Sequence, residues 1–358
     1  MPGKRQAEAR VRQLCALGLP APLIAPELLR ALRGVLPFSM ADISLNLGSP
    51  LEVIHTYSEF TDPVATALPL LESGDLPHWQ REAMLPPHES PVGTLLPLER
   101  VLAFSRREFE RHDFYHCVIR PLGGGGDAIF VRLHEHECSI GVVMSRRREE
   151  QAFSAGEKRA FADLLPHIHH ALTTAAGYSG TWSEGDEQGL FLLDAQGDIR
   201  HICPTAQALL LRATHAQTPL VSEKIRPRLK ALCHRLLSIF RGEEGAAPAV
   251  WHHENATGRY AFRAYWLDPL QPGEGLIGVT VSRQIPLPLK LLRRMAELPL
   301  SPREQEICLL LVQGQPYAAI AGKLCRSERT IISHAQNIFA KLGVDNRAQL
   351  ANRLSAGF

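Results

Sequence analysis

The sequence lacks several of the patterns that would assign its class directly. No uninterrupted apolar run approaches the roughly 18 residues that a membrane-spanning helix needs. The seven cysteines are odd in number and form neither a C-x-x-C pair nor a zinc-finger spacing. This pattern favours free thiols in a reducing compartment over a disulfide or zinc framework. We therefore expect a cytoplasmic protein that has no membrane partner.

Motifs for enzyme chemistry are missing as well. There is no Walker A loop, no H-E-x-x-H and no G-x-S-x-G, so we predict that the protein is not an enzyme. The run GGGG at 123–126 precedes a strand pattern, which favours a hairpin loop over a dinucleotide-binding turn. His134, His136 and Cys138 alternate as strand residues do, which leaves a metal or haem sensor as an alternative. Our prediction has no metal site and no cofactor.

The chain does contain enough apolar residues for several hydrophobic cores. Of its 358 residues, 45% are hydrophobic and 21% are charged, which predicts two or three folded domains. The net charge of +2 is unevenly placed. Residues 283–358 contain 11 Lys and Arg against 5 Asp and Glu, whereas the preceding residues contain 28 against 32. Any electrostatic attraction to nucleic acid is therefore expected at the C-terminal end.

The order of helix and strand patterns predicts an α+β multidomain chain. A turn-rich polar segment at 177–188 indicates a boundary between two sheet-plus-helix domains. In the first domain we expect a strand hairpin at 128–145 and helices over 104–119 and 154–176. The expected parts are a domain at 1–178, a domain at 179–285, a linker helix at 286–299 and an all-α unit of four helices at 300–358.

The last unit contains the most specific pattern in the sequence. Ser301 and Glu304 form a capping box at the start of a helix that Gly314 ends. A short second helix over 317–324 is followed by a tight turn, and Ser327 then caps a third helix. We expect Gly343 to end that helix, and Asp345 to cap the fourth one. Helix, short helix, tight turn and helix together form a helix-turn-helix arrangement.

The third helix has two different faces. Its inward stripe consists of Ile331, Ala335, Ile338 and Leu342, spaced 4, 3 and 4 residues apart. Polar residues dominate the opposite face, as contact with base edges requires. Basic residues at the rim are suited to phosphate contacts; they are Lys323, Arg329, Lys341 and Arg347.

This unit resembles the LuxR-type (GerE-like) DNA-binding domain. The matching motifs are L-S-P-R-E-x-E at 300–306, I-A-x-x-L at 320–324, S-x-x-T-I-x-x-H at 327–334 and N-I-x-x-K-L-G-V at 337–344. The resemblance implies base contacts from the exposed early positions of the third helix, here Ile332, Ser333 and Gln336. It implies phosphate contacts from flanking positions, here Lys323, Thr330, His334, Asn337 and Lys341. It also implies dimerisation through the fourth helix, here by Arg347, Leu350 and Leu354.

The upstream part resembles sensor domains that precede such units. Residues 190–211 are similar to the opening of a PAS domain, and residues 20–176 are more weakly similar to a GAF-like domain. These resemblances imply a DNA-binding transcription regulator, acting as a homodimer on double-stranded DNA and RNA polymerase. A small-molecule or redox signal would control it, through an unidentified effector whose binding residues are unknown. One expected mechanism is that the sensor domains prevent the third helix from docking.

Three alternatives remain open at this stage. The upstream domains could serve only for dimerisation, so that the regulator acts independently of any ligand. The protein could be a haem or metal redox sensor, or an enzyme whose helical tail is a scaffold.

Overall fold

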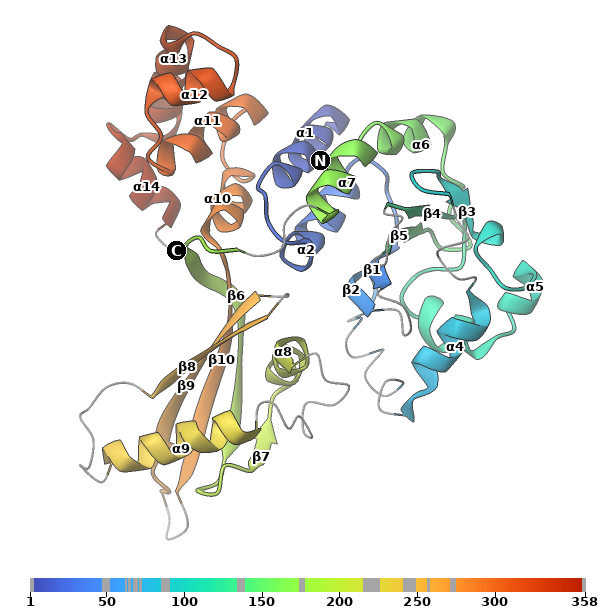
Figure 1. Cartoon of the computed structure of the whole chain (residues 1–358), viewed down its shortest axis with the longest axis vertical. Helices are drawn as coiled ribbons and strands as arrows, with labels where there is room; N and C mark the ends of the chain where they lie inside the picture. The colour runs from blue at the N-terminus through green and yellow to red at the C-terminus, as the bar shows by residue number, and fades with distance from the viewer. Residues whose placement is uncertain are drawn as a thin grey trace.

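The computed structural model consists of two sheet-plus-helix domains and a helical C-terminal unit (Figure 1). It describes residues 3–46, 52–61, 63, 66, 70, 73–84, 91–133, 139–173, 178–214, 226–240, 249–255, 258–270 and 275–355. No helix in these ranges combines the length and the apolarity that crossing a membrane requires.

The first domain contains a five-stranded antiparallel sheet in the order β2-β1-β5-β4-β3. Its strands are β1 Met40–Asn46, β2 Glu52–Ser58, β3 Leu96–Pro97, β4 Ala128–Arg132 and β5 Ser139–Ser145. The expected hairpin is confirmed, because β4 pairs with β5. Its helices are α1 Lys4–Cys15, α2 Ala21–Leu32, α4 Asp75–Ala83, α5 Arg106–Phe109, α6 Ala155–Ala162 and α7 Leu165–Thr173.

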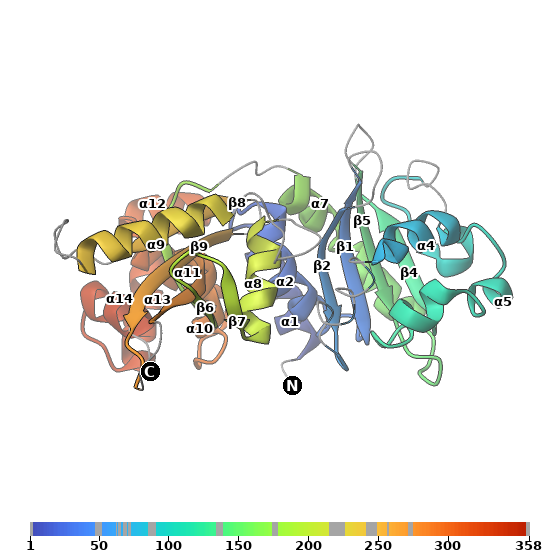
Figure 2. The same ribbon diagram turned by 90° about the horizontal axis from the view of Figure 1, so that it is seen from below.

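The second domain contains a five-stranded antiparallel sheet in the order β7-β6-β10-β9-β8. Its strands are β6 Trp182–Leu193, β7 Ile199–Ile202, β8 Val250–Asn255, β9 Gly258–Leu267 and β10 Leu276–Pro286. Its helices are α8 Pro204–Thr214 and α9 Arg226–Phe240. Figures 1 and 2 both place α8 on the side of this sheet that faces the first domain.

Two expected helices are interrupted in the structure. The helix expected over 104–119 consists of α5 and a separate π-helical turn at Tyr115–Ile119. Between them, Nδ1 of His112 accepts the backbone N–H of Phe114 at 3.1 Å, so a side chain replaces the helical partner of this group. The helix expected over 154–176 divides into α6 and α7. Pro166 explains the break, since it lacks an N–H and its ring clashes with the carbonyl four residues earlier.

The turn-rich polar segment at 177–188, where the sequence indicates a domain boundary, contains the start of a strand. Strand β6 begins at Trp182, which pairs with Pro286 at the end of β10. The polar composition of 177–188 predicts a turn locally, but a strand partner about a hundred residues away supplies the hydrogen bonds of a sheet.

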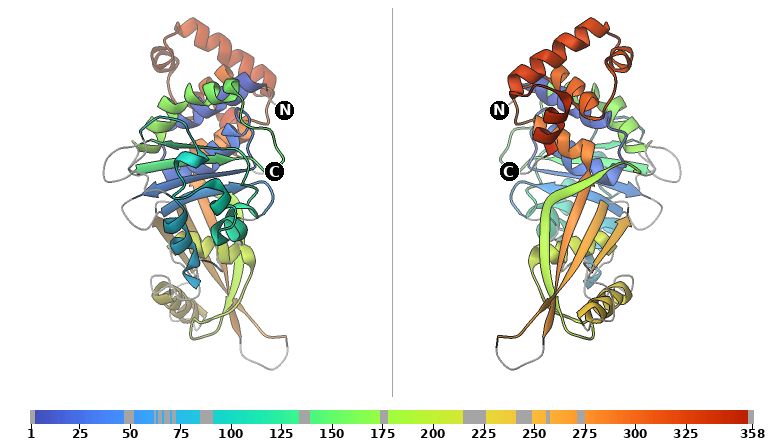
Figure 3. Two further views of the ribbon diagram at one scale, coloured as in Figure 1. Left: turned by 90° about the vertical axis from the view of Figure 1, so that its right-hand side faces the viewer. Right: turned by 90° about the vertical axis from the view of Figure 1, so that its left-hand side faces the viewer.

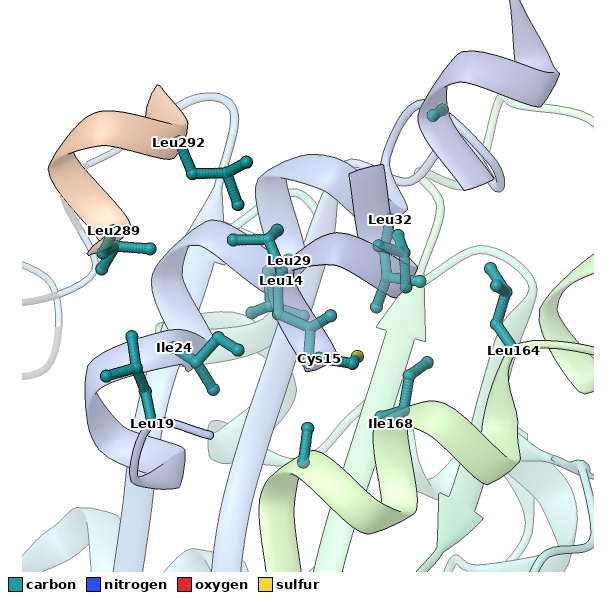
Figure 4. Packing of buried hydrophobic residues seen from close by; sticks show 14 of the residues in the cluster. Leu14, Cys15, Leu19, Ile24, Leu29, Leu32, Leu164, Ile168, Leu289 and Leu292 are labelled. Carbon is teal, nitrogen blue, oxygen red and sulfur yellow. The ribbon is translucent and has the colours of Figure 1, made fainter. Parts of the chain in front are cut away.

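A linker helix, α10 Leu287–Met295, joins the second sheet to the C-terminal unit. One buried apolar cluster extends from α1, α2 and α7 through α10 into that unit. In Figure 4, Leu289 and Leu292 of α10 lie beside the group that includes Leu14, Ile24 and Leu29. The C-terminal unit is therefore packed against the first domain, and not suspended from a free tether.

Polar contacts fix the same junction. The Arg293 guanidinium lies 2.9 Å from the Glu27 carboxylate, which is 9% exposed. Arg10 donates to the carbonyl of Leu292 at 2.5 Å, and Gln13 donates to the carbonyl of Pro302 at 2.6 Å. These contacts hold α10 and the start of the C-terminal unit on α1 and α2, so movement of the unit requires breaking them.

Candidate nucleic-acid interface

The C-terminal unit contains four helices, and a side chain caps the N-terminus of three of them. They are α11 Pro302–Val312, α12 Tyr317–Lys323, α13 Glu328–Leu342 and α14 Arg347–Ser355. At the start of α11, Ser301 Oγ accepts the N–H of Glu304 at 3.3 Å, and the Glu304 carboxylate accepts the N–H of Ser301 at 2.8 Å. The expected capping box is therefore confirmed. Ser327 Oγ accepts the N–H of Thr330 at 3.2 Å, which confirms the cap of α13.

The ends of α11 and α13 also agree with the sequence. Gly343 follows α13 in the left-handed conformation, with φ of 61°, where a residue without a Cβ is favoured. Gly314 follows α11 with φ of 77°. The expected cap of α14 is wrong by one position. Asn346 Oδ1, rather than Asp345, accepts the N–H of Gln349 at 2.9 Å.

The turn between α12 and α13 depends on a residue that the sequence did not identify. Cys325 has φ of 50°, which makes it the single non-glycine residue in the described part of the chain with a positive φ. Arg303 of α11 donates to the carbonyl of Leu324 at 3.0 Å and pairs with Glu306 at 2.5 Å. Arg303 thereby holds the turn against α11. Only the spacing of Arg303 and Glu306, three residues apart on one helix, could have suggested part of this arrangement.

Helix α13 separates a buried face from an exposed one, as expected. The inward residues Ile331, Ala335, Ile338 and Leu342 are at most 2% exposed. On the opposite side, Ile332 is 37% exposed, and Ser333 and Gln336 are exposed as well. The three residues predicted to read base edges therefore lie together on one accessible helix face. Exposure of Ile332 suits apolar contact with a thymine methyl group.

The structure divides the predicted phosphate contacts into two groups. Lys323, Arg329 and Asn337 are exposed. Thr330 and His334 are half-buried, and the Thr330 hydroxyl lies 2.7 Å from Ser327 Oγ at the cap of α13. The exposed residues can reach a phosphate directly, whereas Thr330 already has a hydrogen-bond partner.

Lys341 also has an ion-pair partner within the chain. Its Nζ lies 2.7 Å from Oε2 of Glu304, whose side chain is 7% exposed. Burial alone would raise the pKa of Glu304, but hydrogen bonds from Lys341 and Ser301 outweigh it and lower that pKa. A phosphate that approached Lys341, whose side chain is 43% exposed, would compete with the Glu304 carboxylate, and phosphate binding by Lys341 stays a prediction.

The residues predicted for dimerisation are engaged inside the unit. Leu350 and Leu354 are 0% and 1% exposed and belong to the main apolar cluster. The Arg347 guanidinium lies 4.1 Å from the centre of the Tyr317 ring and donates to the carbonyl of Gln315 at 2.7 Å. Pairing through α14 stays a prediction, and it would have to use the outward residues of that helix, which include Ala348, Gln349, Asn352 and Arg353.

The upstream domains do not cover α13 in this conformation. The exposed fractions of Ile332, Ser333 and Gln336 leave the reading face accessible, while α11 and α10 make the contacts with the rest of the chain. The exposed face of α13 is therefore not buried in this conformation, and the expectation that the sensor domains prevent the third helix from docking stays a prediction.

The structure also describes the glycine run at 123–126. The glycines at 123–126 form a loop before β4, where Gly126 donates to the carbonyl of Arg146 at 2.7 Å. A Cβ on Gly126 would lie 2.1 Å from the carbonyl oxygen of Arg147, so close backbone approach explains a glycine there.

The candidate metal ligands His134, His136 and Cys138 lie outside the described residues. Within the described ranges, no group of three potential ligands could hold a metal ion.

A short helix, a tight turn and a third helix with an accessible polar face define a helix-turn-helix DNA-binding unit. Residues 298–354 match the family model described as "Bacterial regulatory proteins, luxR family". The chain is 44% identical over 50 residues to "Spore germination protein GerE" of Bacillus subtilis, covering 68% of that protein and 14% of this chain. The chain belongs to the luxR family of DNA-binding transcription regulators.

Further relatives share the same segment. "Transcriptional regulatory protein UhpA" of Salmonella typhimurium is 38% identical over 60 residues, which are 17% of this chain and 31% of that protein. The chain thus spans about a third of the length of UhpA. The solved ligand-binding domain of VqsR from Pseudomonas aeruginosa is 14% identical with a TM-score of 0.28, covering 42% of this chain and 84% of that one. This likeness is too low to support any argument about the upstream domains.

Proposed function

We propose that this protein is a sequence-specific, homodimeric transcription regulator of the cytoplasm that acts on RNA polymerase in response to a small-molecule signal. The observation that supports this proposal best is the accessible face of α13, where Ile332, Ser333 and Gln336 lie together. Two copies would insert this helix into major grooves about one DNA turn apart. Residues 1–178 and 179–285 would form the two controlling domains.

In this proposal, base recognition and phosphate binding use different residues. Ser333 and Gln336 can donate and accept hydrogen bonds at base edges, and Ile332 can contact a methyl group. Lys323, Arg329 and Asn337 would bind phosphates on either side of the groove, with weaker contributions from Thr330, His334 and Lys341. Phosphate contacts give affinity and register, whereas the three base-edge residues give specificity.

Control by the upstream domains would act through geometry. Because α13 is already accessible, a signal need not uncover it. The contacts of α10 with Glu27 and Arg10 are suited to setting the direction in which each copy presents α13. A ligand would act by favouring one arrangement of the two reading units over another, to the extent that its affinities for them differ.

The first sheet offers a place for such a signal. Its face opposite α1 and α2 contains Asp42 and Ser44 on β1, and Arg132 on β4. Arg132 is 5% exposed, and its Nε has no hydrogen-bond partner among the described residues. Burial raises the pKa of Asp42 to about 6, despite hydrogen bonds from Thr56 and Ser44. Polar groups buried at such a cost are suited to binding a polar small molecule.

DNA binding is tested by titrating labelled genomic fragments with the full chain in a series of salt concentrations. We expect specific complexes on fragments identified by genome-wide mapping, with affinity that falls steeply as salt rises. The matched control is Ser333→Ala combined with Gln336→Ala, which should retain salt-dependent binding but lose preference between fragments. No salt-dependent affinity at any fragment would contradict the proposal.

A further inference from the structure

The linker helix α10 is attached firmly to the second domain. Strand β10 ends at Pro286 and α10 begins at Leu287, so no residue separates them. Strand β10 is the middle strand of the second sheet, and the right-hand view of Figure 3 shows it running toward the C-terminal unit. Lys290 of α10 also donates to Ser183 Oγ and to the carbonyl of Glu184 on β6, each at 3.0 Å. Movement of the second domain would therefore carry α10 with it.

On its other side, α10 meets a buried carboxylate of the first domain. Glu27 of α2 is 7% exposed, and its Oε1 lies 2.9 Å from the Arg293 guanidinium. The same oxygen pairs with Arg30. Burial lowers the pKa of Arg10 on α1 to about 10, while the nearby charge of Glu27 opposes this shift and that of Arg293 adds to it. One buried carboxylate thus lies among three guanidinium groups from three helices.

The charge of Arg293 depends mainly on this carboxylate for its neutralisation. In the described part of the chain, Asp186 of β6 is the other carboxylate that pairs with Arg293, at 3.5 Å. Asp186 is 88% exposed, and an exposed pair contributes little because water screens it. Nε of Arg293 is buried and has no hydrogen-bond partner among the described residues. Loss of Glu27 would therefore leave Arg293 without a buried counter-ion.

Helix α2 connects Glu27 with the sheet of the first domain. Leu28 of α2 is fully buried in one apolar cluster with Ile43 of β1. Asp42, the neighbour of Ile43 on that strand, faces the opposite side of the sheet, where the proposed signal would bind. A shift of this sheet against α2 would move Glu27 relative to Arg293.

We propose that Glu27 is an electrostatic latch: its pairing with Arg293 holds the DNA-binding unit on the first domain, and loss of this pairing releases α10 to move with the second domain. The inference rests on the proposed function, to which it adds a means of control. Without the charge of Glu27, three guanidinium groups would remain close together around a neutral side chain, and burial of unpaired charge is costly. Gln305 of α11 donates to the carbonyl of Met295 on α10 at 3.0 Å, so the reading unit would follow α10.

Hydrogen exchange of the full chain carrying Glu27→Gln, measured by mass spectrometry, tests this latch. We expect the amides of α10 to exchange at least about 10-fold faster than in the unmodified chain, because exchange reports how often a docked surface opens. Amides of α1 should also exchange faster, since release uncovers the surface of α1 that α10 contacts. Amides of α13 and β10 should keep their rates. The matched control is Asp186→Asn, the exposed partner of Arg293, which should change the rates less than about twofold.

Arg293→Gln removes the other half of the pair and should give the same pattern, which also keeps the test valid where Glu27→Gln does not fold. In the double variant, α10 should exchange no more than about twofold faster than in Arg293→Gln alone, because the two substitutions break one interaction. Additive effects, or unchanged exchange of α10 in either single variant, would overturn the inference.

Faster exchange of α13 and β10 together with α10 would also overturn it, since Glu27 would then support the whole fold. The exchange measurement requires no DNA. A chain that shows the latch but binds no DNA would therefore contradict the proposed function and leave the latch in place. A chain that binds DNA but shows no coupling between Glu27 and Arg293 would contradict only the latch.

Discussion

Nζ of Lys341 lies 2.7 Å from Oε2 of Glu304, and this contact joins α13 to the cap of α11. The same carboxylate oxygen accepts the N–H of Ser301. One buried carboxylate therefore serves both as a helix cap for α11 and as the counter-ion of Lys341 on α13, the helix that we propose to read DNA. The position of α13 thus depends on the charge of Glu304.

Glu304→Gln is expected to lower the stability of the C-terminal unit by roughly 1–2 kcal/mol at pH 7, since a charged hydrogen bond is replaced by neutral ones. The pKa of Glu304 is lowered in the folded chain. Its contribution is therefore fully present above the ordinary value of 4.5 and is lost as the pH falls through the folded value. Chemical denaturation at pH 7 and pH 3 measures both effects. The exposed control, Glu328→Gln, should change little, and an equal loss in it would refute this role.

Gln336→Ala and Lys323→Ala should change DNA binding in different ways: the first should reduce sequence specificity, and the second should reduce overall affinity. Loss of Gln336 removes a base-edge group, so discrimination between DNA sites should fall by about 1–3 kcal/mol at one position. Loss of Lys323 removes a phosphate contact, so all sites should weaken similarly and the slope of affinity against salt should fall by about one. Competition titrations with permuted sites at several salt concentrations distinguish the two. Identical behaviour would mean that the exposed face of α13 is assigned wrongly.

Arg347→Ala should destabilise the C-terminal unit by roughly 1 kcal/mol without changing the oligomeric state. The side chain stacks on Tyr317 and donates to the carbonyl of Gln315, and both contacts are within one chain. Thermal melting and light scattering give the two measurements. Arg347→Lys should recover part of the stability, because an ammonium retains a cation–π contact. Dissociation of a dimer by the alanine variant would instead return Arg347 to the interface.

Asp42→Asn should stabilise the protein at neutral pH. Burial raises the pKa of Asp42 from 3.8 to about 6, so the folded chain holds a proton that the unfolded chain releases. Stability should therefore fall as the pH rises between these values and remain lower above them. The asparagine variant should gain roughly 2–3 kcal/mol at pH 7.5 and nothing at pH 4. Melting temperatures across this range measure the difference. The exposed control, Asp113→Asn, should show no such pattern.

The parts of the fold that were predictable depend on neighbours in the sequence. The caps at Ser301 and Ser327 and the left-handed Gly343 act within one turn of helix, and all three are found. The interruptions of the two helices near His112 and Pro166 also have local causes. Predicting them requires recognising that the His112 side chain or the Pro166 ring interrupts a regular helical pattern. Apolar periodicity alone does not reveal them.

Contacts between distant segments could not be predicted in the same way. Nothing in 177–188 indicates that Trp182 pairs with Pro286. The α14 leucines have the pattern of an amphipathic helix, and that pattern is the same whether the partner is another chain or α10 and α11. Nothing in the sequence around Lys341 likewise indicates its contact with Glu304, 37 residues earlier.

By itself the sequence determined the class of this protein, because a helix-turn-helix is specified by caps, stops and one helix's two faces, all of which are short-range features. Only the tertiary structure decided which side chains remain available on that unit and which are already engaged. It also decided that Leu190 and Tyr265 of the second sheet stay exposed, since their exposure depends on which elements pack beside them. Whether a side chain is available to bind a partner depends on its burial and its contacts in three dimensions, and the order of the residues alone does not specify these.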